Sequence, residues 1–183
     1  MKMKTQSSIQ KVVMTGMLAA VMAVMSQIQF PLPSGVPVTM QTFAMALAGY
    51  ILGWKYGLAS TAVYILLGAV GVPVFAGFSG GLGFTVSPAG GYIWGFLPMV
   101  ALCGLGYEKR NMPALIGFSV AGLACCHILG LIQLSIVTGL GAWAAFLAGS
   151  APYLVKDLVS LAAAFAVAKA VRRALAGAGA QMA

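Results

Sequence analysis

Three ionisable side chains lie inside apolar stretches of this sequence, and these residues are the best placed to do chemistry. Lys156 and Asp157 are adjacent near the start of the last apolar run, and His127 lies midway along the run before it. An ionisable residue at the centre of a membrane span costs about 2.5–3.5 kcal/mol, so such residues usually mark a functional site. Asp157 is therefore the leading candidate, because no other carboxylate lies within the apolar runs.

Each of these residues also has a purely structural interpretation. Lys156 and Asp157 could form an interfacial ion pair, with the carboxylate favoured by the positive N-terminal end of its helix. His127 could take part in a proton relay, but such a relay needs further acids, so we expect a histidine hydrogen-bonded inside a helix bundle. Glu108 is followed by Lys109 and Arg110 and is predicted to be solvated.

The composition predicts an integral membrane protein. The chain has 183 residues, of which 61% are hydrophobic and only 7% charged, against roughly 25% charged residues in ordinary soluble domains. The net charge of +8 does not point to nucleic acid, because the basic residues occur at the ends of apolar runs. The first run reaches Phe30 and is followed by further apolar runs, which argues against a cleaved signal peptide.

Six apolar runs are predicted to cross the membrane as helices, since a span needs about 20 residues. With six spans and a cytoplasmic N-terminus, every basic residue except Lys156 lies on the cytoplasmic side, as the positive-inside rule requires. The second and third spans meet at Lys55 and are predicted to form a tight hairpin. The spans are 12–30, 38–54, 56–71, 91–107, 113–139 and 151–173, in one all-α domain covering residues 1–183 with both termini cytoplasmic.

The stretch 72–91 is predicted to be a long external loop that forms part of a binding pocket. Its six glycines and two prolines break helical continuity, yet it carries apolar side chains such as Phe75 and Phe84. Irregular backbone at membrane depth is tolerated only where protein covers it or where it lines a cavity. The other external connections, 31–38 and 140–150, are also uncharged.

The remaining motifs favour binding and assembly over catalysis. Cys103, Cys125 and Cys126 have neither disulfide nor metal spacing and are interpreted as small core residues. No G-x-x-x-x-G-K-[ST], HExxH or nucleophile motif occurs, so energy for active transport would come from another chain or an ion gradient. Small residues on the first span suit close helix packing, either within the bundle or against a partner subunit; they are Gly16, Ala19, Ala20 and Ala23.

Four segments closely resemble the BioY family. They are IQFPLPSGVPVTMQTFAMALAGYILG (28–53), LLGAVGVPVFAGFSGG (66–81), SPAGGYIWGF (87–96) and PYLVKD (152–157). Members of that family are the biotin-binding S components of energy-coupling factor (ECF) vitamin transporters. The resemblance implies a six-helix S-component bundle in the cytoplasmic membrane of a prokaryote, with a high-affinity biotin site near the outer face. It also implies biotin uptake without catalysis, cofactor or metal, and as partners a transmembrane T component and two ABC-type ATPases.

The resemblance also implies roles for particular residues. The family's acid near the start of the last helix matches Asp157, and a carboxylate suits the N–H donors of biotin's ureido ring. A lid at 31–39 and T-component docking by Gly16, Ala19, Ala20 and Ala23 are implied as well. The predicted biotin-binding residues are Gln41, Phe75, Gly77, Ser79, Gly80, Gly81, Tyr92, Tyr153, Lys156, Asp157 and Ser160.

The chain departs from the family pattern at Ser160, at Ile93 and at SPAGGY (87–92), where GPTGGY is usual, and three alternatives stay open. Ser160 and Ile93 stand where many relatives carry basic or polar residues, so Lys156, loop N–H groups and solvent all remain candidate partners for the biotin carboxylate. The first alternative is an S component for another vitamin. The second is an intramembrane enzyme using Asp157 and His127 as acid and base, and the third is a structural or channel-like subunit.

Overall fold

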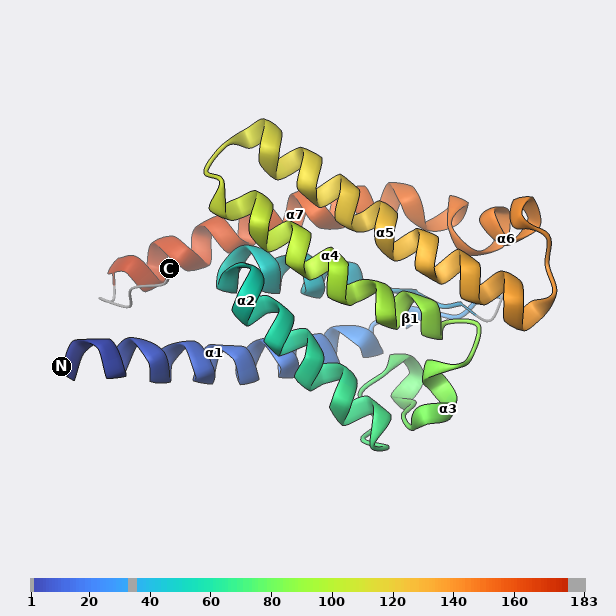
Figure 1. Cartoon of the computed structure of the whole chain (residues 1–183), viewed down its shortest axis with the longest axis horizontal. Helices are drawn as coiled ribbons and strands as arrows, with labels where there is room; N and C mark the ends of the chain where they lie inside the picture. Colours follow the sequence, from blue (N-terminus) through green and yellow to red (C-terminus); the bar gives the residue numbers. More distant parts are fainter. Residues whose placement is uncertain (1, 33–35, 178–183) are drawn as a thin grey trace.

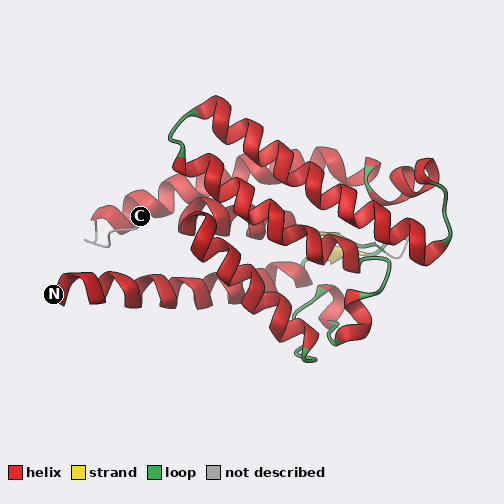
Figure 2. Ribbon diagram, viewed as in Figure 1, coloured by secondary structure: helices red, strands yellow, loops and turns green. Residues whose placement is uncertain are grey.

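The computed structural model describes residues 2–32 and 36–177, with side chains from residue 9 onward. The fold is a bundle of helices with one very small sheet (Figure 2). The long helices are α1 (Lys2–Gln27), α2 (Gln41–Ala69), α4 (Gly90–Glu108), α5 (Met112–Thr138) and α7 (Ala151–Gly177). Helices α4 and α5 run side by side, with α7 behind them and α1 at the lower edge of the view (Figure 1).

Among the described residues, four helices are long and apolar enough to cross a membrane. They are residues Ile9–Gln27 of α1 together with the whole of α2, α4 and α5. This finding confirms the prediction of a multi-pass membrane protein. The count of six crossings stays a prediction, because α2 contains two of the predicted spans and α7 is not among these four helices.

Helix α2 doubles back on itself at Gly53. The Gln41 side chain donates a hydrogen bond to Tyr64 Oη over 2.8 Å, although the two residues are 23 apart in sequence. In a straight helix they would be about 35 Å apart. Gly53 has φ 74° and ψ −179°, a backbone conformation that is essentially restricted to glycine. Residues 41–52 and 54–69 therefore form two antiparallel helical arms.

Charged side chains from other helices hold this turn. The Trp54 N–H, at the start of the second arm, donates to Glu108 Oε1 over 3.2 Å. Arg172 of α7 donates to the carbonyls of Tyr50 and Ile51, at the end of the first arm, over 2.9 and 3.0 Å. An acid at a helix start and a base at a helix end satisfy unpaired backbone groups and oppose the helix dipoles. Glu108 is exposed as predicted, but it also caps this arm.

Glycines let the central helix α4 approach its neighbours closely. A Cβ atom at Gly95 would lie 2.7 Å from Cα of Cys126 on α5, closer than real Cβ contacts. Such small residues allow apolar helices to pack backbone against backbone in lipid. The core between α2, α4, α5 and α7 includes Tyr50, Met99 and Cys103, each at most 2% exposed.

The loops are more ordered than the sequence indicates. The stretch 72–91, expected to contain no helix, holds a 3₁₀ turn η1 (Ala76–Phe78) and one helical turn α3 (Leu82–Thr85), besides the start of α4. The predicted connection 140–150 contains the helix α6 (Ala142–Gly149). Strands β1 (Gln29–Phe30) and β2 (Val38–Thr39) pair antiparallel at the base of the 31–38 loop. Glycines broke the helices as predicted, but short apolar runs between them still fold into single turns.

We expect Gly53→Ala to lower the thermal stability of the detergent-solubilised protein. A methyl group there requires an unfavourable positive φ and would lie 2.3 Å from Glu108 Oε1, so the loss should be about 1–3 kcal/mol. Gly117→Ala is the matched control, because its new methyl would meet no heavy atom within 4 Å. Equal melting temperatures for the two variants would contradict the proposed turn.

Candidate ligand-binding site

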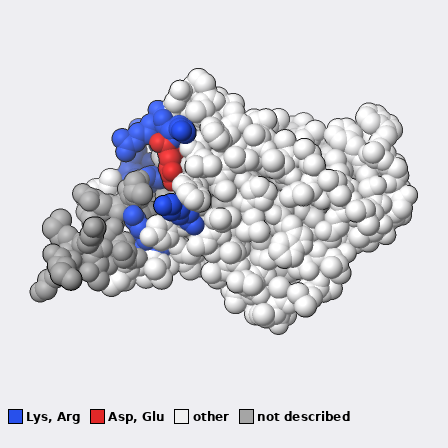
Figure 3. All heavy atoms as spheres, viewed as in Figure 1, with Lys and Arg blue, Asp and Glu red and all other residues white. Residues whose placement is uncertain are grey.

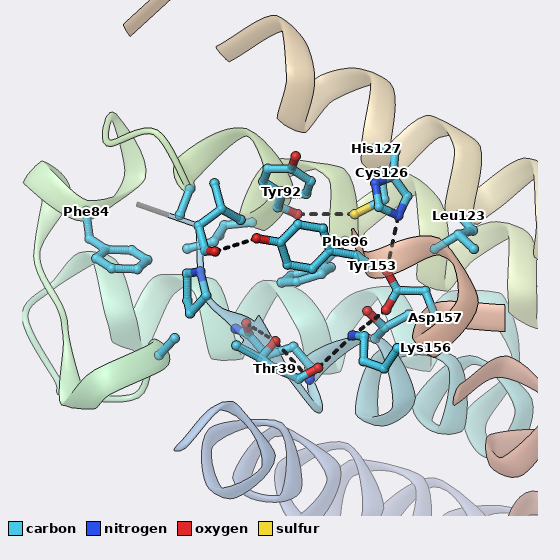
Figure 4. Close-up of a pocket in the computed structure, with 17 residues that line it drawn as sticks. Thr39, Phe84, Tyr92, Phe96, Leu123, Cys126, His127, Tyr153, Lys156 and Asp157 are labelled. Atoms are coloured by element: carbon cyan, nitrogen blue, oxygen red, sulfur yellow. Dashed lines mark hydrogen bonds and ion pairs between the residues drawn. The ribbon is translucent and has the colours of Figure 1, made fainter. Parts of the chain in front are cut away.

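A cavity lies where the first arm of α2, the start of α4, the middle of α5 and the start of α7 converge (Figure 4). Its volume is about 50 Å³. Most of the wall is apolar, with polar groups concentrated on α2, α5 and α7. The lining residues are Val36, Pro37, Thr39, Gln41, Thr42, Ala76, Phe84, Ala89, Tyr92, Ile93, Phe96, Leu123, Cys126, His127, Tyr153, Lys156 and Asp157.

Asp157 is the charged centre of this cavity. Its side chain is buried, and the residue is only 3% exposed. Oδ2 lies 3.1 Å from Nε2 of His127, and Oδ1 forms an ion pair with the Lys156 ammonium. A buried carboxylate flanked by an ammonium and an imidazole keeps its charge in a dry site, while Oδ1 retains capacity to accept a further hydrogen bond.

His127 of α5 connects the Asp157 carboxylate to Ser150, the residue just before α7. Its Nδ1 lies 2.8 Å from the Ser150 hydroxyl, just before α7, while Nε2 faces Asp157. A neutral ring that donates from Nε2 and accepts at Nδ1 satisfies both contacts. The interpretation of His127 as hydrogen-bonded inside the bundle is therefore confirmed. His127 is not among the predicted binding residues, although its position within an apolar run is a signal that could have identified it.

Two side chains of α7 hold the 31–39 loop over the cavity. The Tyr153 hydroxyl donates to the carbonyl of Val36 over 2.5 Å, and the Lys156 ammonium donates to the carbonyl of Thr39 over 2.7 Å. Both dashed contacts are visible in Figure 4. Residues three apart share one helix face, so Tyr153 and Lys156 both reach this segment from the same side of α7. The predicted lid residues 33–35 lie outside the described part of the chain.

Polar side chains on α2 and α4 are already satisfied within the protein. Gln41 accepts a hydrogen bond from the Thr39 hydroxyl over 2.9 Å and donates to Tyr64. Tyr92 donates to the carbonyl of Gly149 over 2.5 Å, and its ring meets the His127 ring edge to face at 5.9 Å. These contacts hold two walls of the cavity in place.

Five of the eleven predicted binding residues line the cavity: Gln41, Tyr92, Tyr153, Lys156 and Asp157. The other six, Phe75, Gly77, Ser79, Gly80, Gly81 and Ser160, are not among the residues that line it.

Within the glycine-rich loop, Phe75 supports the cavity wall from behind. Phe75 is fully buried and stacks on Phe84, which does line the cavity, at 5.2 Å between ring centroids. Gly77 takes a left-handed φ of 69°, and the Phe75 and Ser79 backbones are bonded to each other. Only Ala76, Phe84 and Ala89 of this loop reach the cavity.

Two further sequence predictions concern cysteines and helix α1. Cys103 and Cys126 are buried, and all three cysteines are free, which agrees with their interpretation as small core residues. No group of three metal-binding side chains occurs in the described residues. On α1, Gly16 and Ala20 are exposed and Ala23 is partly exposed, but Ala19 packs into the core at 4% exposure. The predicted docking face is thus open at Gly16 and Ala20 and closed at Ala19.

The fold and the cavity define a class: a multi-pass membrane protein whose apolar helix bundle encloses a small cavity with a buried carboxylate. The BioY family profile matches residues 1–177. The chain belongs to the BioY family.

Individual relatives agree with this assignment. The chain is 36% identical to a Thermotoga maritima protein named biotin transporter BioY, over 90% of this chain and 96% of the relative. It is 34% identical to the Rhodobacter capsulatus protein of the same name, over 88% and 93% of the two chains. The crystal structure of an S-component for biotin from an ECF-type ABC transporter superposes with a TM-score of 0.83, covering 92% of this chain and 93% of that one at 21% identity. That likeness shows a shared fold.

We expect Tyr153→Phe to loosen the lid without unfolding the bundle. The change removes only the hydroxyl that donates to Val36, so amide hydrogen exchange should quicken in peptides spanning 36–41 and stay unchanged in α4. Tyr56→Phe is the control, because no hydrogen bond of the Tyr56 hydroxyl occurs among the described residues. Equal exchange in both variants would show that this contact does not hold the lid.

Proposed function

We propose that this protein captures biotin and takes part in its uptake, as the substrate-binding S component of an ECF transporter. Family membership makes it a transport component and not an enzyme. Relatives named biotin transporters support the ligand. The observation that carries the proposal within this structure is the buried Asp157 carboxylate, which lines a cavity whose wall is mostly apolar.

The chemistry of the cavity suits a small ring that donates N–H bonds. The ureido group of biotin offers two N–H donors, and a carboxylate in a dry site accepts such bonds strongly. Ile93, Phe96 and Leu123 provide apolar surface for the fused rings and the aliphatic chain. Asp157 would take the ureido N–H groups, while Tyr92 and Tyr153 would flank the rings.

The partner of the biotin carboxylate is open in this proposal. Lys156 was a candidate from the sequence, but its ammonium already contacts Asp157 and the carbonyl of Thr39. The ammonium has three N–H donors, so two are already committed and one is left for a ligand. Backbone N–H groups of the loop and solvent at the mouth also remain as alternatives.

Ligand entry would require the lid to open. The cavity holds about 50 Å³, whereas small-molecule sites usually span about 300–1,000 Å³. Val36, Pro37 and Thr39 form part of the wall, and Tyr153 and Lys156 of α7 donate hydrogen bonds to this segment. Breaking these contacts would widen the site from the side of the 31–39 loop, and reforming them would enclose the ligand.

The same proposal covers membrane topology and assembly. Six crossings would be formed by α1, the two arms of α2, α4, α5 and α7, within a prokaryotic cytoplasmic membrane. Basic residues gather at the end of the molecule opposite the lid (Figure 3), which supports a cytoplasmic location for that end. A T component would dock on the exposed small face of α1, and two ATPases would supply the energy.

Asp157→Asn should weaken biotin binding by about 1.5–3 kcal/mol, the usual contribution of hydrogen bonds to a charged group. Isothermal titration of the detergent-purified protein with biotin would measure the loss. Ser160→Ala is the control: this serine is buried one turn further along α7 but does not line the cavity. An unchanged dissociation constant in Asp157→Asn would remove Asp157 from the site, and competition by thiamin or riboflavin but not dethiobiotin would identify another vitamin.

Gly16→Leu should reduce co-purification with the T component and leave biotin affinity unchanged. A leucine there would meet no heavy atom of its own chain within 4 Å at Cβ, so it should alter only the outer face. The control is Ala121→Leu, an exposed small residue on α5. Normal assembly of Gly16→Leu would show that α1 does not dock the partner through this face.

A further inference from the structure

A groove separate from the candidate site runs between α5 and α7 and opens at the charged end of the molecule. Its inner part is lined by Tyr50, Met112, Leu115, Ile116, Ser119, Val120, Leu158, Leu161, Ala162 and Phe165. Its outer part is lined by Gly106, Tyr107, Arg110, Asn111, Met112, Leu115, Phe165, Lys169 and Arg172. The two parts share Met112, Leu115 and Phe165, so they form one continuous recess.

The inner part is almost purely apolar. Its only side-chain polar atoms are the Tyr50 and Ser119 hydroxyls, which bond to each other over 2.7 Å. Met112, Ile116 and Leu158 are 53%, 57% and 49% exposed, so large apolar side chains border the groove without a protein partner. A surface of this kind suits a hydrocarbon chain.

The outer part is cationic. Arg110, Lys169 and Arg172 line it, and no acidic side chain does. Arg172 is already engaged with the turn of α2 and lies 4.6 Å over the Tyr107 ring. The Arg110 guanidinium and the Lys169 ammonium, in contrast, make no hydrogen bond or ion pair with any residue that the structure describes. Glu108, at the same end, is bonded to Trp54 and does not line the recess.

We propose that this recess binds one anionic phospholipid, with its phosphate between Arg110 and Lys169 and an acyl chain in the α5–α7 groove. Along α7, Leu158 and Lys169 are eleven residues apart, or about 16 Å. This length matches one leaflet of hydrocarbon, which is half of about 30 Å. Basic pockets between membrane helices are a recognised way to bind lipid headgroups, and charge complementarity favours a lipid over an apolar partner helix.

Native mass spectrometry of the detergent-purified protein tests the proposal. Phosphatidylglycerol and phosphatidylcholine with identical acyl chains would be added separately, and we expect tighter retention of phosphatidylglycerol. The double variant R110Q/K169Q should lose that preference, by about fivefold for each charge removed. The control R173Q/K55Q removes two charges at the same end from residues that do not line the recess, and it should retain the preference.

Further arms test the acyl chain and the source of the phosphate. Ala162→Trp should fill the groove and weaken retention of both lipids, and glycerol phosphate should not displace phosphatidylglycerol.

Equal retention of the two lipids by the unmodified protein, or equal losses in R110Q/K169Q and R173Q/K55Q, would overturn the proposal. Displacement of phosphatidylglycerol by glycerol phosphate would assign the site to a soluble phosphate. If Ala162→Trp retains both lipids unaltered but no longer assembles with the T component, the groove binds a partner helix instead of a lipid. If the double variant does not fold, R110Q and K169Q alone should each reduce retention about fivefold.

Discussion

The structure of the binding end depends on one buried carboxylate. Asp157 is 3% exposed within a bundle that is otherwise almost uncharged, and an isolated charge there would be very costly. It is retained because Lys156 and His127 flank it and Ser150 holds the far side of the imidazole. Stabilising this charge therefore requires α5 and the start of α7 to lie together, and that convergence creates the cavity.

Helix α7 connects the cavity to its cover. Tyr153, Lys156 and Asp157 lie within five consecutive residues, yet two of them donate to the lid backbone and the third carries the buried charge. Lys156 contacts both the lid and Asp157. A ligand that donates N–H bonds to the carboxylate would compete with this ammonium, which would link ligand binding to the position of the lid. The small size of the cavity agrees with a site that opens by moving this cover.

At the end of the molecule opposite the cavity, charged side chains stabilise a helix turn. Glu108 and Arg172 satisfy backbone groups at the turn of α2, which allows two short apolar arms to replace one long helix. The other cations at this end have no such task, and Arg110 and Lys169 face an apolar groove. Charge is thus concentrated where water or lipid headgroups can solvate it, and among the described side chains the exception is the Lys156–Asp157 pair.

The sequence by itself determined the membrane class, the approximate helix boundaries and the family, and it singled out Asp157, because hydropathy and a lone intramembrane acid are local signals. It did not determine which loop residues face the cavity. Phe75 was expected in the wall but lies behind Phe84, and Ser160 lies one turn away from the lining. His127 meets Asp157 from 30 residues away, and only the packing of α5 against α7 brings them together. Which way a side chain points in an apolar bundle depends on which helices are in contact. When every face of a helix is apolar, the sequence does not indicate which face packs against which neighbour.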